Sequence, residues 1–136
     1  METLKLPYLT IEQENRKLIL TKIPAGVLTD ISYVAVRRQS DEPGAVQRVL
    51  NTRRIASIKK FTLEVGKYPG AIILNWVSKD NPIQRDNSKI AFRNAPRSAQ
   101  LIDGQHRLAG IKEAIKEREE VASLEIPVVI YENLDT

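Results

Sequence analysis

Residues 101–111 read LIDGQHRLAGI and contain the single histidine of the chain. Five consecutive side chains there could do chemistry: Asp103, Gly104, Gln105, His106 and Arg107. An apolar run precedes them and an amphipathic pattern follows, so they fall where a strand becomes a helix. The first N–H groups of a helix lack internal partners and attract anions. The turn is therefore typical of a phosphate-binding site.

Each of these residue types has a use in such a site. Gly104 allows a positive φ or a close approach of the backbone, and Arg107 offers two parallel donors to a phosphate. His106 can donate a hydrogen bond or exchange a proton near neutral pH. Asp103 is expected to cap the helix, or to hold Mg²⁺ or a ribose hydroxyl. Gln105 can position a water or bind a base or a phosphate.

The same residues also have an interpretation without a ligand. An Asp–Gly pair before a helix is a common cap and turn. A lone histidine or arginine in the first turn of a helix is often only a surface residue. The cluster by itself indicates an anion site and does not name a reaction.

The distribution of charge also points to an anionic partner. Residues 37–67 carry eight basic and three acidic side chains, a net charge of +5, whereas residues 111–136 carry a net charge of −4. A basic segment attracts the phosphates of nucleic acid or of a nucleotide, although it can also be a solvated helix face. The expected DNA contacts are Arg37, Arg38, Arg48, Arg53, Arg54, Lys59 and Lys60.

Several classes of protein are excluded by composition. The chain has no cysteine, which rules out disulfides, a thiolate nucleophile and cysteine-bound zinc. No apolar run approaches the roughly 20 residues that cross a bilayer, and the N-terminus is too polar for a signal peptide. We therefore expect a soluble, cytoplasmic protein with no membrane partner.

The elements that must position the turn alternate between strands and helices. Strands are predicted at 6–11, 17–23, 31–36, 71–77, 89–93, 100–103 and 124–131, with the first two paired. Helices are predicted at 45–65, divided near Asn51, and at 105–120; Pro24–Gly26 and 78–89 are predicted to be a break and a loop. Pro127 favours an edge strand or a strand start. The sequence thus predicts a mixed α/β fold with a β-α-β element around the turn.

The motif and its flanks resemble a known family. LIDGQHRLAGI is similar to the signature of DGQHR-domain proteins, which include DndB-like regulators of DNA phosphorothioate modification. AVQRVLNTRRIASIKKF (45–61), YPGAIILNW (68–76) and EIPVVIY (125–131) resemble the regions that flank this signature. The resemblance implies one DGQHR domain over residues 1–136, with a ParB/sulfiredoxin-like mixed sheet and helices. Since proteins of this family are usually longer, we expect an N-terminal piece of a longer protein.

The resemblance also implies site residues. Gly104, His106 and Arg107 match the phosphate-contacting turn of the superfamily, and Asp103 and Gln105 match the narrower signature. Gln47 and Arg48 match an upstream pair expected near the same pocket, with Arg54 as a weaker candidate. The absence of cysteine excludes sulfiredoxin chemistry. The turn also lacks the paired arginines of the ParB motif for CTP, which disfavours CTP.

Three functions remain open at this stage. The first is a DNA-associated regulator, a DndB-like repressor of the modification genes, with a nucleotide-binding turn. The second is an ATPase or phosphotransferase of a DNA modification or defence system, with Asp103, His106 and Arg107 as catalytic residues. It would use ATP or another nucleotide with Mg²⁺ held by Asp103, and Arg48 would help Arg107 to stabilise charge. The third is an interaction module in which the acidic segment 113–120 pairs with the basic centre of another subunit in a homo-oligomer.

Overall fold

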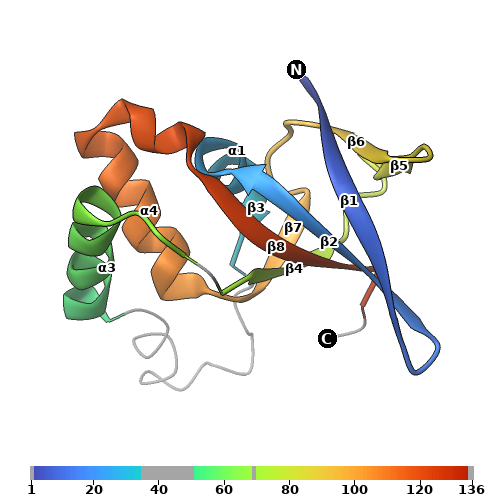
Figure 1. Ribbon diagram of the computed structural model, residues 1–136, viewed down its shortest axis with the longest axis horizontal. Helices are drawn as coiled ribbons and strands as arrows, with labels where there is room; N and C mark the ends of the chain where they lie inside the picture. Colours follow the sequence, from blue (N-terminus) through green and yellow to red (C-terminus); the bar gives the residue numbers. More distant parts are fainter. Residues whose placement is uncertain (1, 35–50, 69, 135–136) are drawn as a thin grey trace.

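A computed structural model describes residues 2–34, 51–68 and 70–134. The mixed α/β class is confirmed, and Figure 1 shows the helices gathered around one end of a curled sheet. The elements in chain order are β1 (Thr3–Gln13), β2 (Arg16–Pro24), α1 (Ala25–Ile31), β3 (Ser32–Tyr33), α3 (Thr52–Glu64), β4 (Ile72–Trp76), β5 (Gln84–Arg85), β6 (Lys89–Arg93), β7 (Ala99–Asp103), α4 (Gln105–Glu117), the 3₁₀ helix η2 (Glu119–Ser123) and β8 (Glu125–Glu132). No helix of the described ranges is long and apolar enough to cross a membrane.

The strands form one sheet in the order β3-β7-β4-β8-β2-β1-β6-β5. The predicted pairing of the first two strands is confirmed, because β1 and β2 form an antiparallel hairpin. The predicted β-α-β element is wrong in one respect. β7 is antiparallel to β4 and β4 is parallel to β8, so β7 and β8 run in opposite directions with β4 between them.

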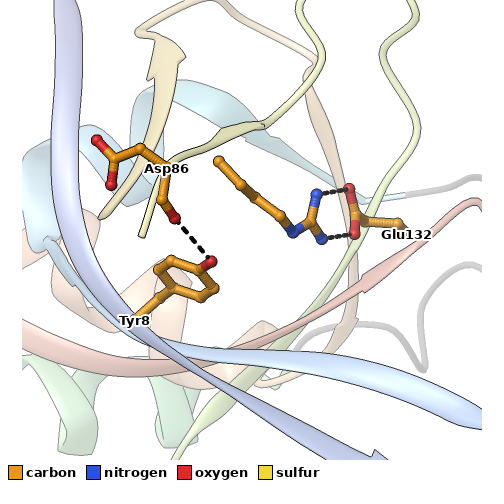
Figure 2. A network of polar contacts seen from close by, with 4 residues as sticks. Tyr8, Asp86 and Glu132 are labelled. Atoms are coloured by element: carbon orange, nitrogen blue, oxygen red, sulfur yellow. Dashed lines mark hydrogen bonds and ion pairs between the residues drawn. The ribbon is translucent and has the colours of Figure 1, made fainter. Parts of the chain in front are cut away.

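The sheet curls around an aliphatic core. Trp76 of β4 and Phe92 of β6 have ring centroids 4.8 Å apart, although three strands lie between them in the sheet order. The curl also brings the edge strand β5 back to β8, where Arg85 forms a two-point ion pair with Glu132. Figure 2 shows this pair beside Tyr8, whose hydroxyl donates to the carbonyl oxygen of Asp86 at 3.2 Å. Polar contacts thus fasten the free edge of the sheet.

Predictions for the first third of the chain need correction. Pro24–Gly26 is not a simple break, because Pro24 is the N-cap of α1. Helix α1 buries Ala25, Leu28 and Ile31 completely, and its seven residues are too few for a clear helical period. Of the strand predicted at 31–36, the structure assigns Ser32–Tyr33 to β3, and residues 35–36 lie outside the described part.

The later predictions are mostly confirmed. The buried strand at 71–77, the strands at 89–93 and 100–103, and the final strand appear as β4, β6, β7 and β8. The loop at 78–89 contains the short β5, and α4 ends at Glu117 rather than at residue 120. Pro127 lies in a strand with neighbours on both sides, but pairing with β4 begins only at Val128. The edge assignment is therefore wrong for β8, although Pro127 itself is paired on the β2 side alone.

Helices α3 and α4 lie side by side and run in the same direction, as Figure 1 shows. Asn51, where the sequence predicted a division, is the N-cap of α3 and contacts the first turn of α4; the part of the predicted helix at 45–50 lies outside the described residues. Gly110 lets the two backbones approach, because a Cβ there would collide with Ile58 and stand 3.1 Å from the Ile55 carbonyl oxygen. The two N-termini therefore meet at one end of the helix pair.

Candidate anion-binding site

The DGQHR turn adopts the strand-to-helix geometry that the sequence predicts, with one change of role. Gly104 is the N-cap of α4 and has φ +111°, in the left-handed region that favours glycine. A Cβ at this position would stand 3.0 Å from Cγ1 of Ile72, so a side chain would also crowd Ile72. Asp103 is the last residue of β7 and does not cap the helix, so the capping prediction is wrong.

The start of α4 keeps its positive end open. No described side chain caps its first N–H groups, and its first turn contains no acidic residue. The first turn of α3 also contains no acidic residue, and it carries Arg53 and Arg54. Since each helix N-terminus bears roughly half a positive charge, two parallel helices place both positive ends together. The arrangement favours an anion between them.

A pocket of about 270 Å³ lies at this point. All five motif residues line it, together with Ile102 from β7 and three residues from outside the motif. Those three are Arg54 and Ile58 of α3 and Tyr68 of the segment that follows α3. The weaker sequence candidate, Arg54, is therefore brought to the motif. Asp103 is exposed and is the only carboxylate among the described lining residues.

Arg107 is held from one side and open on the other. Its Nη1 donates to the carbonyl oxygen of Gly70 at 2.5 Å, and its Cζ lies 5.6 Å from the centre of the Tyr68 ring. A guanidinium has five N–H donors, so most of them remain for a ligand. Arg107 can therefore present a preoriented fork to a phosphate.

His106 uses one ring nitrogen inside the protein. Its Nε2 accepts a hydrogen bond from the backbone N–H of Asn51 at 2.8 Å. An imidazole nitrogen that accepts must carry a lone pair, so the ring is neutral with its proton on Nδ1 in this arrangement. Nε2 is thus occupied by α3, and Nδ1 is the nitrogen that remains for a ligand.

Tyr68 is the residue that sequence reasoning missed. Its hydroxyl bonds with Oγ1 of Thr62 and lies 3.3 Å from the carbonyl oxygen of Ile58. The hydroxyl of Thr62 also bonds to the carbonyl oxygen of Ile58, at 2.7 Å, so the three groups form one small polar cluster. Burial raises the pKa of Tyr68, while the hydrogen bond with Thr62 and the charge of Arg107 oppose this shift. The aromatic residue in KYPG was the available signal, but only the fold brings it to Arg107.

Three other basic candidates, Arg53, Lys59 and Lys60, are not among the residues that line the pocket. Lys59 forms an ion pair with Glu117 of α4 at 3.3 Å, within the same chain. Arg53 and Lys60 are exposed, and neither has an ion-pair partner among the described residues. The remaining candidates, Arg37, Arg38, Gln47 and Arg48, lie outside the described residues.

The donor set does not fit a metal site made by the protein alone. Within the described ranges, no group of three or more histidine, aspartate or glutamate side chains could hold a metal ion. Asp103 is a single carboxylate beside Arg54 and Arg107. Magnesium usually takes one or two carboxylates together with water and substrate phosphates. The residues fit magnesium only as an ion that arrives on a phosphate ligand.

Comparisons with known proteins identify a family for the chain. No curated protein and no solved structure matches the chain. A family model matches residues 6–136, a range that includes most of the hairpin β1–β2, the helix pair and the whole DGQHR turn. The chain therefore belongs to the DndB family, described as DNA-sulfur modification-associated.

Proposed function

We propose that this protein is a DNA-associated regulator, a DndB-like repressor of the genes for DNA phosphorothioate modification, whose DGQHR pocket binds a nucleotide phosphate. One observation carries the proposal: Arg54 and Arg107 line one pocket at the uncapped start of α4. Family membership supports the link to DNA sulfur modification. We also propose a ParB/sulfiredoxin-like fold, because the DGQHR motif resembles the turn of that superfamily.

The pocket favours a phosphate group of a small ligand over the backbone of duplex DNA. Its volume of about 270 Å³ is slightly below the range of about 300–1,000 Å³ that is typical of sites for whole small molecules. A terminal phosphate fits such a space, and the rest of the nucleotide would extend outside. Duplex phosphates lie on a convex surface and are better matched by exposed cations such as Arg53 and Lys60.

The nucleotide part is tested by calorimetry with ATP, GTP and CTP plus Mg²⁺. We expect binding to the native chain and a loss of about 100-fold in Arg107→Ala, because a charge-assisted, two-point contact with phosphate is removed. Arg97→Ala is the matched control, since Arg97 also stacks on a tyrosine, Tyr33, at 4.2 Å. Equal losses in both variants, or no binding by the native chain, would contradict a phosphate site at the motif.

The DNA part is tested by the salt dependence of duplex binding. Each phosphate contact contributes roughly one unit to the slope of log K against log salt. We expect Arg53→Ala and Lys60→Ala each to lower this slope by about one, with little change in nucleotide affinity. Lys59→Ala should change it less, because Lys59 is already paired with Glu117. A flat dependence in the native chain would argue against direct DNA binding.

Nucleotide hydrolysis is the second candidate function. It is favoured by Asp103, an exposed carboxylate that lines the pocket and has no ion-pair partner in the described chain. The carboxylate of Asp103 could position a water molecule that is bound to the magnesium ion of the nucleotide. Release of phosphate from ATP that disappears in Asp103→Asn, while ATP binding persists, would support this function. Tight binding without any turnover would leave the pocket as a regulatory site.

A further inference from the structure

Two backbone N–H groups at the start of α3 donate to side-chain acceptors. One acceptor belongs to the N-cap residue of α3 and the other to helix α4. Oδ1 of Asn51 accepts from the backbone N–H of Arg54 at 3.1 Å. Nε2 of His106 accepts from the backbone N–H of Asn51 itself at 2.8 Å. Together these bonds reproduce the pattern of a capping box, in which the N-cap side chain and a second side chain satisfy two N–H groups.

The second acceptor is unusual in its origin. In an ordinary capping box the residue at the third helical position, a glutamate or glutamine, reaches back to the N-cap N–H. In α3 that position is Arg54, which has no acceptor and whose positive charge opposes the helix dipole. Helix stability alone would favour an acid at position 54. The sequence places a pocket-lining arginine there instead.

We propose that His106 is a positioning residue: it completes the capping box of α3 from α4 and so leaves position 54 free for an arginine that faces the phosphate pocket. This inference rests on the proposed function only in taking phosphate as the ligand. On this proposal Nε2 of His106 has a structural role, because its lone pair accepts the hydrogen bond from the backbone N–H of Asn51. The histidine then sets the distance between Arg54 and the DGQHR turn.

The first experiment exchanges His106 for two amides of different length. His106→Gln carries an amide oxygen close to the position of Nε2, whereas His106→Asn ends near the position of Nδ1. We expect the Asn51 amide to exchange its hydrogen about 3- to 10-fold faster in His106→Asn, as for loss of a helix cap, and to keep its protection in His106→Gln. Affinity for inorganic phosphate, measured by calorimetry, should fall about 3- to 10-fold in His106→Asn and return in His106→Gln.

The second experiment restores the ordinary capping box. Arg54→Glu in the His106→Asn background supplies the missing acceptor, so protection of the backbone N–H of Asn51 should return while the affinity for phosphate stays reduced. Arg53→Glu is the matched control, because it makes the same change of charge one position away from the capping-box residue. Arg53→Glu in the same background should leave the backbone N–H of Asn51 unprotected from hydrogen exchange. This separation of protection from affinity is not expected of a histidine that acts on the ligand.

The outcomes decide between the two roles. If His106→Gln loses phosphate as His106→Asn does, with the Asn51 amide unaffected in both, His106 contacts the ligand and the inference is overturned. Unchanged exchange in His106→Asn overturns it as well. If the native chain binds no phosphate, the phosphate site of the proposed function fails, but the exchange and rescue measurements still judge the capping role of His106.

Discussion

The two ends of the α3–α4 pair carry similar side chains with opposite consequences. At the C-terminal end, Arg118 donates to the carbonyl oxygen of Leu63 at 3.0 Å and Lys116 lies in the last turn of α4. Cations there stabilise the negative ends of the helices. At the N-terminal end, Arg54 and Arg107 stand beside the positive ends without an acid in either first turn.

The comparison of the two ends separates basic residues that serve stability from basic residues that serve function. A basic residue that complements a helix dipole is explained by stability alone. A basic residue placed against the dipole, with no carboxylate in the adjoining helical turns, needs another explanation, and an anionic ligand supplies one. Counting basic residues along the sequence cannot make this distinction, because it depends on which helix ends meet.

The largest effect on stability is expected from a substitution that pushes helices α3 and α4 apart. Gly110→Ala places a methyl group against Ile58 and 3.1 Å from the Ile55 carbonyl oxygen. Helix propensity alone would stabilise the protein by about 1 kcal/mol, whereas overpacking costs about 1–3 kcal/mol. We expect a net loss of up to about 2 kcal/mol in the free energy of unfolding by urea, with weaker phosphate binding. A gain in stability would show that the two N-termini are not held together by this contact.

A smaller effect should distinguish the two ends directly. Without phosphate, Arg118→Ala should lower the free energy of unfolding by about 0.5–1 kcal/mol, because a cation and a donor leave the end of α3. Arg54→Ala should leave it unchanged or raise it by a few tenths. Added phosphate should stabilise the native chain and Arg118→Ala but not Arg54→Ala, as followed by thermal unfolding. Similar behaviour of the two variants would remove the contrast between the ends.

The smallest effect concerns Tyr68, which connects Arg107 with α3. Its folded-state pKa is raised above 10.0, so the folded protein holds this proton more tightly than the unfolded chain does. The associated stability is present below pH 10 and is lost as the pH rises through the folded-state pKa. We expect Tyr68→Phe to remove part of the alkaline loss of stability, measured by urea unfolding between pH 9 and 11. The same slope in Tyr33→Phe and Tyr68→Phe would contradict this.

Much of the fold followed from local patterns, and the remainder depends on tertiary pairing. The continuous run 71–77 and the motif helix were readable because apolar content and period are strong there. The reversed direction of β7 and β8 was not readable, since it depends on β4 lying between them. The edge alternative for Pro127 was wrong for a related reason: which side of a strand is paired at a given residue depends on the neighbouring strands.

The candidate site shows the same division. Residue types within the turn predicted a strand-to-helix junction with a positive φ as one use of Gly104, and both are present. The partners that complete the site, Arg54 and Tyr68, are far from the motif in sequence and are brought to it by the α3–α4 packing and the following segment. The sequence prediction placed the N-cap of α4 at Asp103, one residue too early, because Gly104 takes that position.

The central position of β8 has a consequence for how the protein is made. Residues 125–132 pair with both β2 and β4, so the two halves of the sheet cannot join before this segment is available. Until then, β2 and β4 each present an unpaired edge, and such edges promote association between chains. The hairpin β1–β2 can form early during synthesis, but the sheet closes late. Expression of any version that stops before Glu125 should therefore yield aggregates rather than a smaller folded domain.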